Sequence, residues 1–249
     1  QAPRALFLAK YSPSGEQLWA KQFGTCGQYS HVRGLAIGDN DEIYLTGDFK
    51  DGPFDLGGGG LVSAGATDVF IGALNKDGEH HWSLARGGQN WDFGGAISLD
   101  HDGHLVSAFV AGGRLSLISL TLSGEVVFER QTEAVLSINE SFASAVSGVT
   151  TSISGDIYVT GRSTLSGVDF GGGPLPPSQL EGAFVASYAH SDGAYRWARG
   201  LVTSLGNTVS NEGLRATGII SEGEDVVAFG SFPGTVDFGG GPRTAGNEF

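Results

Sequence analysis

The chain has 249 residues, enough for one large all-β domain or two smaller domains. Its 14 basic and 27 acidic residues give a net charge of −13, which argues against nucleic acid as a partner. The sequence contains no run of 18 apolar residues, so we expect no membrane-spanning helix. Glycine is abundant, at 42 residues, and it gathers in short clusters between apolar runs, as is typical of turns rather than disorder.

From the N-terminus, the chain first offers two short strand-like runs joined by a tight turn. The first run is Ala5–Tyr11, and the second follows Gly15 and ends near Phe23. The connection Ser12-Pro-Ser-Gly has the residues of a hairpin turn, in which glycine supplies a positive φ. This segment therefore predicts a β-hairpin.

Three longer repeats follow, over residues 32–86, 94–131 and 143–200, and each contains four strand-like runs that we name A to D. Short Asp-, Asn-, Ser- and Gly-rich turns join A to B and C to D, so each repeat predicts two linked hairpins. The predicted strands are Val32–Gly38, Gly94–Leu99 and Ala143–Thr151 for A; Ile43–Gly47, His104–Ala108 and Ile157–Gly161 for B; Asp68–Leu74, Arg114–Leu120 and Gly182–Tyr188 for C; and runs ending near Arg86, Gln131 and Gly200 for D.

The two ends of the chain carry complementary halves of one further repeat. Residues 5–23 supply strands C and D, and residues 213–232 supply A and B as Leu214–Ile220 and Val226–Gly230. Sixteen short strands in four sheets predict an all-β chain, a single β-propeller domain over residues 1–249 with four blades of four antiparallel strands and a closing blade built from both termini. Pairing the ends would remove two exposed sheet edges. The alternative is an open piece of a longer tandem array.

Two short motifs recur in the repeats. A glycine, three further residues and then an aromatic mark the start of each D run, and Asp-Phe/Leu-Gly-Gly-Gly follows strand B. The copies are Gly15–Trp19, Gly78–Trp82, Gly124–Phe128 and Gly193–Trp197 for the first motif, and Asp55–Gly59, Asp169–Gly173 and Asp237–Gly241 for the second, which we name the glycine cassette. We expect each cassette Asp to cap its turn, with Phe170 and Phe238 buried. Repeat 94–131 lacks the cassette and turns at Ala111-Gly-Gly113, which predicts either an open sector of the loop face or a place where another domain docks.

The segment Ala73–Trp82 resembles the tryptophan-docking motif of quinoprotein-type propellers. The whole unit, with Val168-Asp-Phe-Gly-Gly-Gly, the Gly-x-x-x-Trp motif and a Val-Thr-Gly strand, resembles repeats of large secreted or surface propeller proteins of bacteria. The resemblance implies a secreted or cell-surface protein and no catalytic residues. It also implies that the four aromatics of the first motif pack between blades: Trp19, Trp82, Phe128 and Trp197. The single cysteine is compatible with an exported or a cytosolic protein.

Acidic residues gather in two of the A–B turns and suggest a weak metal site. The residues are Asp39 and Asp41 in one turn, and Asp100 and Asp102, flanked by His101 and His104, in another. Oxygen ligands suit structural calcium, and the histidines would suit a site of mixed nitrogen and oxygen ligands. The alternative is two polar hairpin turns. We expect no other cofactor.

The D–A connections differ among the repeats and predict the ligand-binding face. Trp91 is the one tryptophan without a counterpart in the other repeats, and Asn90, Asp92 and Tyr29 lie in the same class of loop. Exposed aromatics on loops of a rigid scaffold are typical ligand contacts, so we expect these four residues to contact a ligand. The alternative is that Trp91 packs beneath its own loop.

No catalytic constellation is evident, since the chain has neither a nucleophile elbow nor a metalloprotease helix motif. The leading hypothesis is a non-enzymatic interaction module of an exported bacterial protein that binds a protein or glycan partner on its long-loop face. One alternative is a glycan-active hydrolase or lyase with acidic residues at the axial mouth. Another is a purely structural spacer in a larger assembly.

Overall fold

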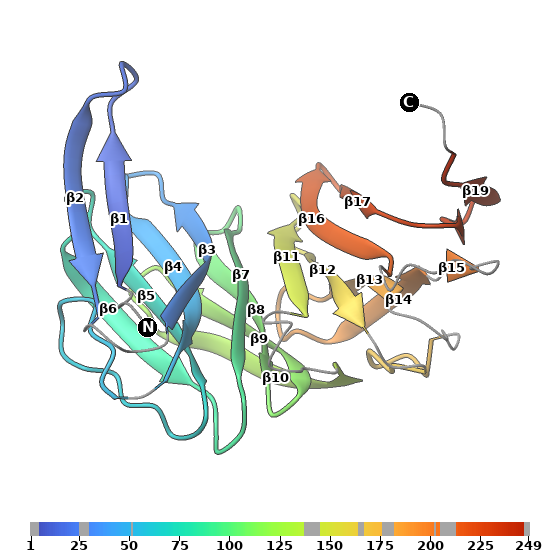
Figure 1. Ribbon diagram of the computed structural model, residues 1–249, viewed down its shortest axis with the longest axis horizontal. Coiled ribbons are helices and arrows are strands. Elements are labelled where there is room, and N and C mark those ends of the chain that lie inside the picture. Colours follow the sequence, from blue (N-terminus) through green and yellow to red (C-terminus); the bar gives the residue numbers. More distant parts are fainter. Residues whose placement is uncertain are drawn as a thin grey trace.

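The computed structural model describes residues 5–24, 30–50, 52–136, 145–163, 167–175, 182–201, 203–204 and 213–246, and the regular elements in these ranges are all β-strands (Figure 1). Three four-stranded antiparallel sheets follow one another along the chain, each a meander of consecutive strands. They contain β3 (Ser30–Ile37), β4 (Ile43–Phe49), β5 (Asp68–Leu74) and β6 (His80–Arg86); β7 (Phe93–Leu99), β8 (His104–Ala111), β9 (Arg114–Thr121) and β10 (Val126–Val135); and β11 (Val146–Thr151), β12 (Ile157–Ser163), β13 (Gly182–Tyr188) and β14 (Tyr195–Leu201).

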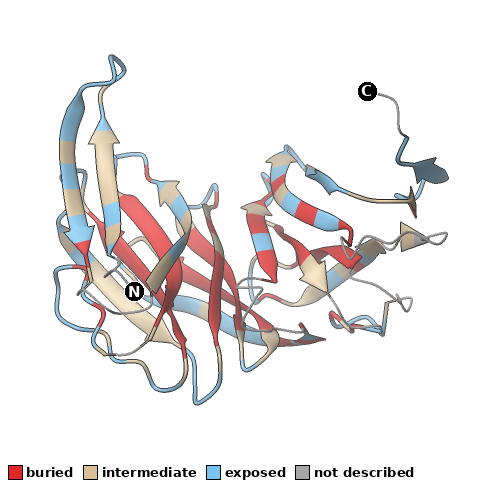
Figure 2. Ribbon diagram, in the orientation of Figure 1, coloured by how far each residue is buried: buried red, intermediate tan, exposed pale blue. Residues whose placement is uncertain are grey.

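The core lies in the middle strands of these three sheets. Every residue of β4, β5 and β13 is buried, as are the inner residues of β8 and β9 in the second sheet, and Figure 2 shows buried residues in red in the middle of the sheets. Apolar side chains on both faces of a strand need cover on both faces, which adjacent sheets supply. The A strands β3, β7, β11 and β16 contact one another in series, so the sheets are arranged around their inner edges, as in a propeller.

The glycine–aromatic motifs lie at the joints between successive repeats. A Cβ atom built on Gly78 would meet the Trp19 ring at 3.1 Å, and one on Gly124 would meet Trp82 at 2.7 Å. The same relation joins Gly193 to Phe128, at 2.8 Å. Trp19 Nε1 donates to the Lys76 carbonyl at 3.1 Å, and Trp82 Nε1 donates to the Leu122 carbonyl at 2.8 Å. Each aromatic therefore covers the turn of the next repeat, where only glycine leaves room for the ring.

The terminal hairpins do not form the expected closing sheet. β1 (Leu6–Tyr11) pairs with β2 (Gln17–Phe23), and β16 (Arg215–Glu222) pairs with β17 (Asp225–Ser231), as two separate two-stranded sheets. Figure 1 shows the two hairpins at opposite ends of the row of sheets. β1 and β17 do not pair with each other, and apolar side chains on both strands, such as Phe7 and Phe229, are exposed to solvent.

A small third group of strands, which the sequence did not predict, surrounds the last glycine cassette. It pairs β15 (Thr203–Ser204), β18 (Thr235–Asp237) and β19 (Pro242–Thr244). In the other two copies a single bridge closes the cassette, Phe54 with Leu61 and Asp169 with Pro174. The cassette is thus a small hairpin in every copy. Among the described residues, no helix has the length and apolar content needed to cross a bilayer.

Candidate functional site

The Trp91 loop is held to its own surroundings by three contacts. Trp91 forms a parallel bridge with Thr67, and its ring stacks on Phe93 with 6.1 Å between centroids and 10° between planes. The Lys50 ammonium lies 5.0 Å from the centre of the Trp91 ring. The ring is half-buried, while Asn90 beside it is exposed. Trp91 therefore packs on its own loop and leaves part of its surface for contact with a ligand.

Asp92 faces the interior and fastens this loop to the next sheet. Its two oxygens accept hydrogen bonds from the amides of Gly88 and Gly112, each at 2.6 Å, and the residue is fully buried. Burial raises the pKa of Asp92, with a smaller contribution from nearby Asp68, while the two amide hydrogen bonds lower it. Asp92 is therefore placed to support the loop rather than to contact a ligand directly as the sequence had predicted.

A cavity of about 390 Å³ lies above this support, between the first and second sheets. Gly88 and Gly112, the two glycines that Asp92 holds, both line it. Its other lining residues belong to β6, β8, β9 and β10 or directly follow β6: Arg86, Gly87, Phe109, Ala111, Ser116, Glu129 and Gln131. The volume is within the range of small-molecule sites, and the lining combines one aromatic ring with several polar groups.

Polar side chains that line the cavity form hydrogen bonds and an ion pair with neighbouring groups of the protein. Arg86 Nε lies 2.9 Å from Glu129 Oε2, and Gln131 Nε2 donates to the Ala111 carbonyl at 2.8 Å. Phe109 is 1% exposed and forms an apolar floor. A polar ligand would therefore meet fixed donors and acceptors around an apolar base, an arrangement that lowers the entropic cost of binding.

The cavity lies at the joint where the glycine cassette is missing. In the first sheet, the cassette residue Leu56 and the preceding Phe54 fill the corresponding joint and pack with Phe23 of β2. In the third sheet, Phe170 does the same beside Phe128. The second sheet has only the Ala111-Gly-Gly113 turn, which inserts no aromatic at its joint with the first sheet.

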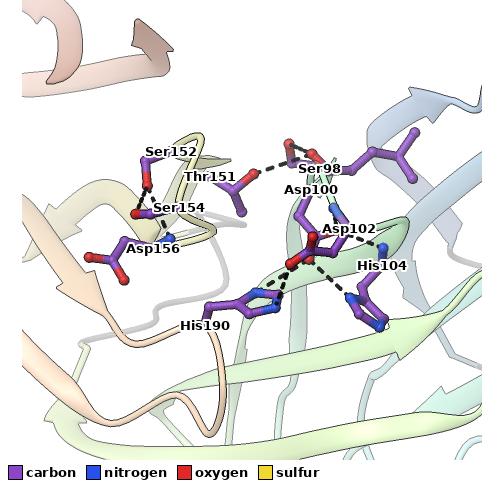
Figure 3. Close-up of polar contacts among 10 residues, drawn as sticks. Ser98, Asp100, Asp102, His104, Thr151, Ser152, Ser154, Asp156 and His190 are labelled. Carbon is purple, nitrogen blue, oxygen red and sulfur yellow. Dashed lines mark hydrogen bonds and ion pairs between the residues drawn. The ribbon is translucent and has the colours of Figure 1, made fainter. Parts of the chain in front are cut away.

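The acidic A–B turns do not form one site. Asp39 and Asp41 are exposed, and Asp41 Oδ2 is paired with Lys10 Nζ at 3.1 Å, which leaves less negative charge for a cation. Asp100 instead lies in a group with His104 and His190, whose ligand atoms all fall within 4.8 Å of one another (Figure 3). Asp102 also approaches His190, with 3.4 Å between Oδ2 and Nε2.

Tyr29 lies outside the described residues, and its contact with a ligand stays a prediction. Sequence reasoning missed His190, because this residue comes from a C–D turn about 90 positions from Asp100. It also missed Arg86 and Gln131, although the absent cassette in repeat 94–131 was a signal for that region. Spacing along one turn reveals Asp100, Asp102 and His104 but not what a neighbouring sheet contributes.

Comparisons with known proteins give a fold-level likeness only. No protein-family model matches the sequence, and no curated protein matches it. Similar solved structures include a protein of unknown function from Bacteroides caccae, 14% identical with a TM-score of 0.41, over 79% of this chain and 73% of that one. They also include a glucose dehydrogenase, 13% identical with a TM-score of 0.35, over 86% of this chain and 84% of that one. The resemblance to bacterial propeller repeats stays a prediction.

Proposed function

We propose that the chain is a non-enzymatic binding module on a closed four-bladed propeller, and that the cavity beside Arg86 and Gln131 receives part of a protein or glycan partner. The single observation that supports binding is that this cavity replaces a cassette which fills the equivalent joint in the other two sheets. An exported bacterial protein is the setting that the resemblance of the repeats favours.

Ring closure is supported by a strand register that the complete sheets share. In the first and third sheets, a glycine of strand B lies opposite a phenylalanine of strand C. The pairs are Gly47 with Phe70 and Gly161 with Phe184. The same positions at the chain ends are Gly230 and Phe7. Phe70 and Phe184 are at most 1% exposed, whereas Phe7 is 79% exposed. Pairing β17 with β1 in this register would bury Phe7.

The same register would complete an aromatic pair and a tryptophan joint. Phe184 lies 4.6 Å from the cassette ring of Phe170, and the equivalent partner for Phe7 is Phe238, which is 51% exposed. Trp197 occupies the motif position that covers a glycine in every other repeat. Its counterpart would be Gly15, whose missing Cβ has open space around it. Three joints in which an aromatic covers a glycine are formed among the described residues, and ring closure would add a fourth, between Trp197 and Gly15.

An apolar cavity marks where the first hairpin would dock. It measures about 480 Å³, lies between the third sheet and the β16–β17 hairpin, and is lined by Trp197, Val226, Ala228, Phe229 and Phe238, among others. Large exposed apolar surfaces in a protein usually mark an interface. We assign this one to β1, because β1 carries the apolar residues Phe7 and Tyr11, both exposed, at the matching positions.

The two neighbouring carboxylates near the Trp91 loop support the enzyme alternative less well. Asp68 and Asp92 are 2% and 0% exposed, so a glycan would not reach them directly. Asp68 Oδ2 accepts the Ala64 amide, and its Oδ1 is buried without a hydrogen bond in the described part of the chain. Two buried acids held by backbone amides suit a structural role.

A binding screen with matched variants tests the proposal. A glycan array and a pull-down would compare the unaltered protein with Arg86→Ala, Gln131→Ala and Trp91→Ala. Arg196→Ala is the control, because Arg196 on the outer strand β14 also pairs with a carboxylate, 2.7 Å from Asp156, but does not line the cavity. We expect loss of signal for Arg86→Ala and Gln131→Ala only, or for Trp91→Ala as well if its ring contacts the ligand. Equal signals from all variants would contradict the assignment of this cavity.

A further inference from the structure

Four polar side chains meet at the joint between the second and third sheets. Asp100, Asp102 and His104 come from the turn between β7 and β8, and His190 comes from the turn between β13 and β14 (Figure 3). The Asp100 side chain is fully buried, and those of His104 and His190 are 28% and 26% exposed. This group lies on the hairpin-turn side of the sheets, separate from the cavity at Arg86.

The distances from Asp100 to the two histidines are longer than those of strong charge-assisted hydrogen bonds and suit a metal site. Asp100 Oδ2 lies 3.3 Å from His104 Nδ1 and 3.4 Å from His190 Nδ1. Charge-assisted hydrogen bonds are usually about 2.7–2.9 Å long. With metal–ligand bonds of about 2.0–2.1 Å, two ligands of a tetrahedral ion lie roughly 3.3–3.4 Å apart. The two distances from Asp100 Oδ2 are those of neighbouring ligands around one small ion, and the three ligand atoms all lie within 4.8 Å of one another.

The local backbone prepares Asp100 for this role. Its Oδ1 accepts the amides of Asp102, at 2.9 Å, and His104, at 2.7 Å, which fixes the carboxylate in the turn. Its Oδ2 accepts no backbone amide and faces both histidines (Figure 3). His190 Nδ1 is buried without a hydrogen-bond partner among the described residues. A buried nitrogen of this kind is costly unless a proton or an ion satisfies it.

We propose that Asp100 Oδ2, His104 Nδ1 and His190 Nδ1 bind one divalent transition-metal ion, with zinc the best match. Two imidazole nitrogens and one carboxylate oxygen suit zinc and disfavour calcium, which takes oxygen ligands. Asp102 Oδ2, 3.4 Å from His190 Nε2, supplies the carboxylate that commonly orients a metal-bound histidine from its other nitrogen. Water completes the coordination.

The ion would fasten two sheets at a joint that has no indole hydrogen bond. Trp19 and Trp82 each donate an indole hydrogen bond to the next repeat, but the equivalent residue at this joint is Phe128, which has no such donor. Residues 100–104 belong to the second sheet and His190 to the third, so a shared ion links them directly. The site is therefore a structural clasp, independent of ligand binding in the cavity.

Metal titration of the purified chain tests the clasp. After dialysis against a chelator, zinc binding would be followed by calorimetry and cobalt binding by its visible absorption, which reports tetrahedral coordination. We expect one ion per chain and a higher melting temperature with zinc. His190→Ala and Asp100→Asn should weaken zinc affinity by more than tenfold, and Asp102→Asn by about tenfold.

His101→Ala is the matched control, because His101 is an exposed histidine of the same turn that does not belong to the group. It should bind zinc as the unaltered protein does. Melting curves in chelator identify any variant that fails to fold, and His190→Gln then replaces His190→Ala. Equal zinc affinity for the unaltered protein and His190 variants, or equal loss with His101→Ala, would overturn the proposal.

Discussion

The middle strands of the complete sheets and the facing strands of the terminal hairpins share a sequence pattern but differ in their surroundings. β4 and β5 are buried at every residue, whereas β17 is almost wholly exposed and β1 only partly covered. Phe70 and Phe7 occupy equivalent positions, with 0% and 79% exposure. Figure 2 shows the same contrast between the red centres of the sheets and the pale ends of the molecule.

This difference shows that a blade of this type is stabilised by its neighbours more than by its own hydrogen bonds. The β1–β2 hairpin has a full ladder and still exposes Phe7, Tyr11 and Leu18. A lone two-stranded hairpin is only marginally stable in water, so these side chains require another surface. The proposed partner is the β16–β17 hairpin, whose Val227 and Phe229 are also exposed.

The largest expected effect comes from truncating the equivalent phenylalanines. Phe184→Ala should lower the free energy of unfolding by about 3–5 kcal/mol, because it empties a buried site in a complete sheet. If the ring closes in solution, Phe7→Ala should cost a similar amount. Chemical denaturation of the two variants measures both.

The control for this pair is Val62→Ala, because Val62 is 72% exposed in the loop between β4 and β5. It should change stability by no more than about 0.5 kcal/mol. A Phe7→Ala effect as small as that of Val62→Ala would mean that β1 stays uncovered.

A smaller effect is expected at the tryptophan joints. Trp82→Phe removes the indole hydrogen bond to the Leu122 carbonyl and should cost about 1 kcal/mol. In a closed ring the equivalent acceptor for Trp197 is the Pro13 carbonyl, so Trp197→Phe should cost the same. Thermal and chemical denaturation would compare the two variants, and a cost for Trp82→Phe alone would favour open ends.

The smallest expected effect is the pH dependence of the stability that Asp92 contributes through its hydrogen bonds to the Gly88 and Gly112 amides. Burial raises the pKa of Asp92 in the folded protein, so its contribution to stability is complete below the unfolded pKa of about 3.9 and is lost as pH rises through the folded pKa. Asp92→Asn does not titrate and should lack this loss. Unfolding free energies measured from about pH 4 to pH 7 should therefore converge or cross for the two proteins. Parallel curves for the two proteins would contradict the raised pKa of Asp92.

Much of the fold could be predicted because turn chemistry and repetition are local properties. The marker glycines Gly15, Gly78, Gly124 and Gly193 all have positive φ, and the strands between them begin within a few residues of the expected positions. The predicted closing sheet is different, because β1 and β17 lie at opposite ends of the sequence and no local turn brings them together. Repeat arithmetic predicted that pairing, and the hairpins are separate in the structure.

The candidate sites could be predicted only in part, for the same reason. Asp100, Asp102 and His104 lie in one turn, so their proximity follows from sequence spacing. His190 joins them only because two sheets pack side by side. Asp92 was grouped with Trp91 by position in the loop, but packing turned its carboxylate inward, toward Gly88 and Gly112.

Ring closure is tested most directly by a cross-link in the register of the complete sheets. Gly72 lies opposite Leu45, and Ala186 lies opposite Val159, so the equivalent pair at the ends is Ala9 with Ala228. Cysteines at both positions, in a Cys26→Ser background, would be directly opposed, at a separation that a disulfide spans. The control pairs Ala9→Cys with Val227→Cys, which faces the other side of the strand.

The account predicts a rapid intramolecular disulfide for Ala9→Cys with Ala228→Cys and almost none for the control, read by mass spectrometry and non-reducing electrophoresis. Free thiols in both variants would contradict closure and favour an open array. A disulfide-linked dimer would contradict the single-chain ring and favour one shared by two chains.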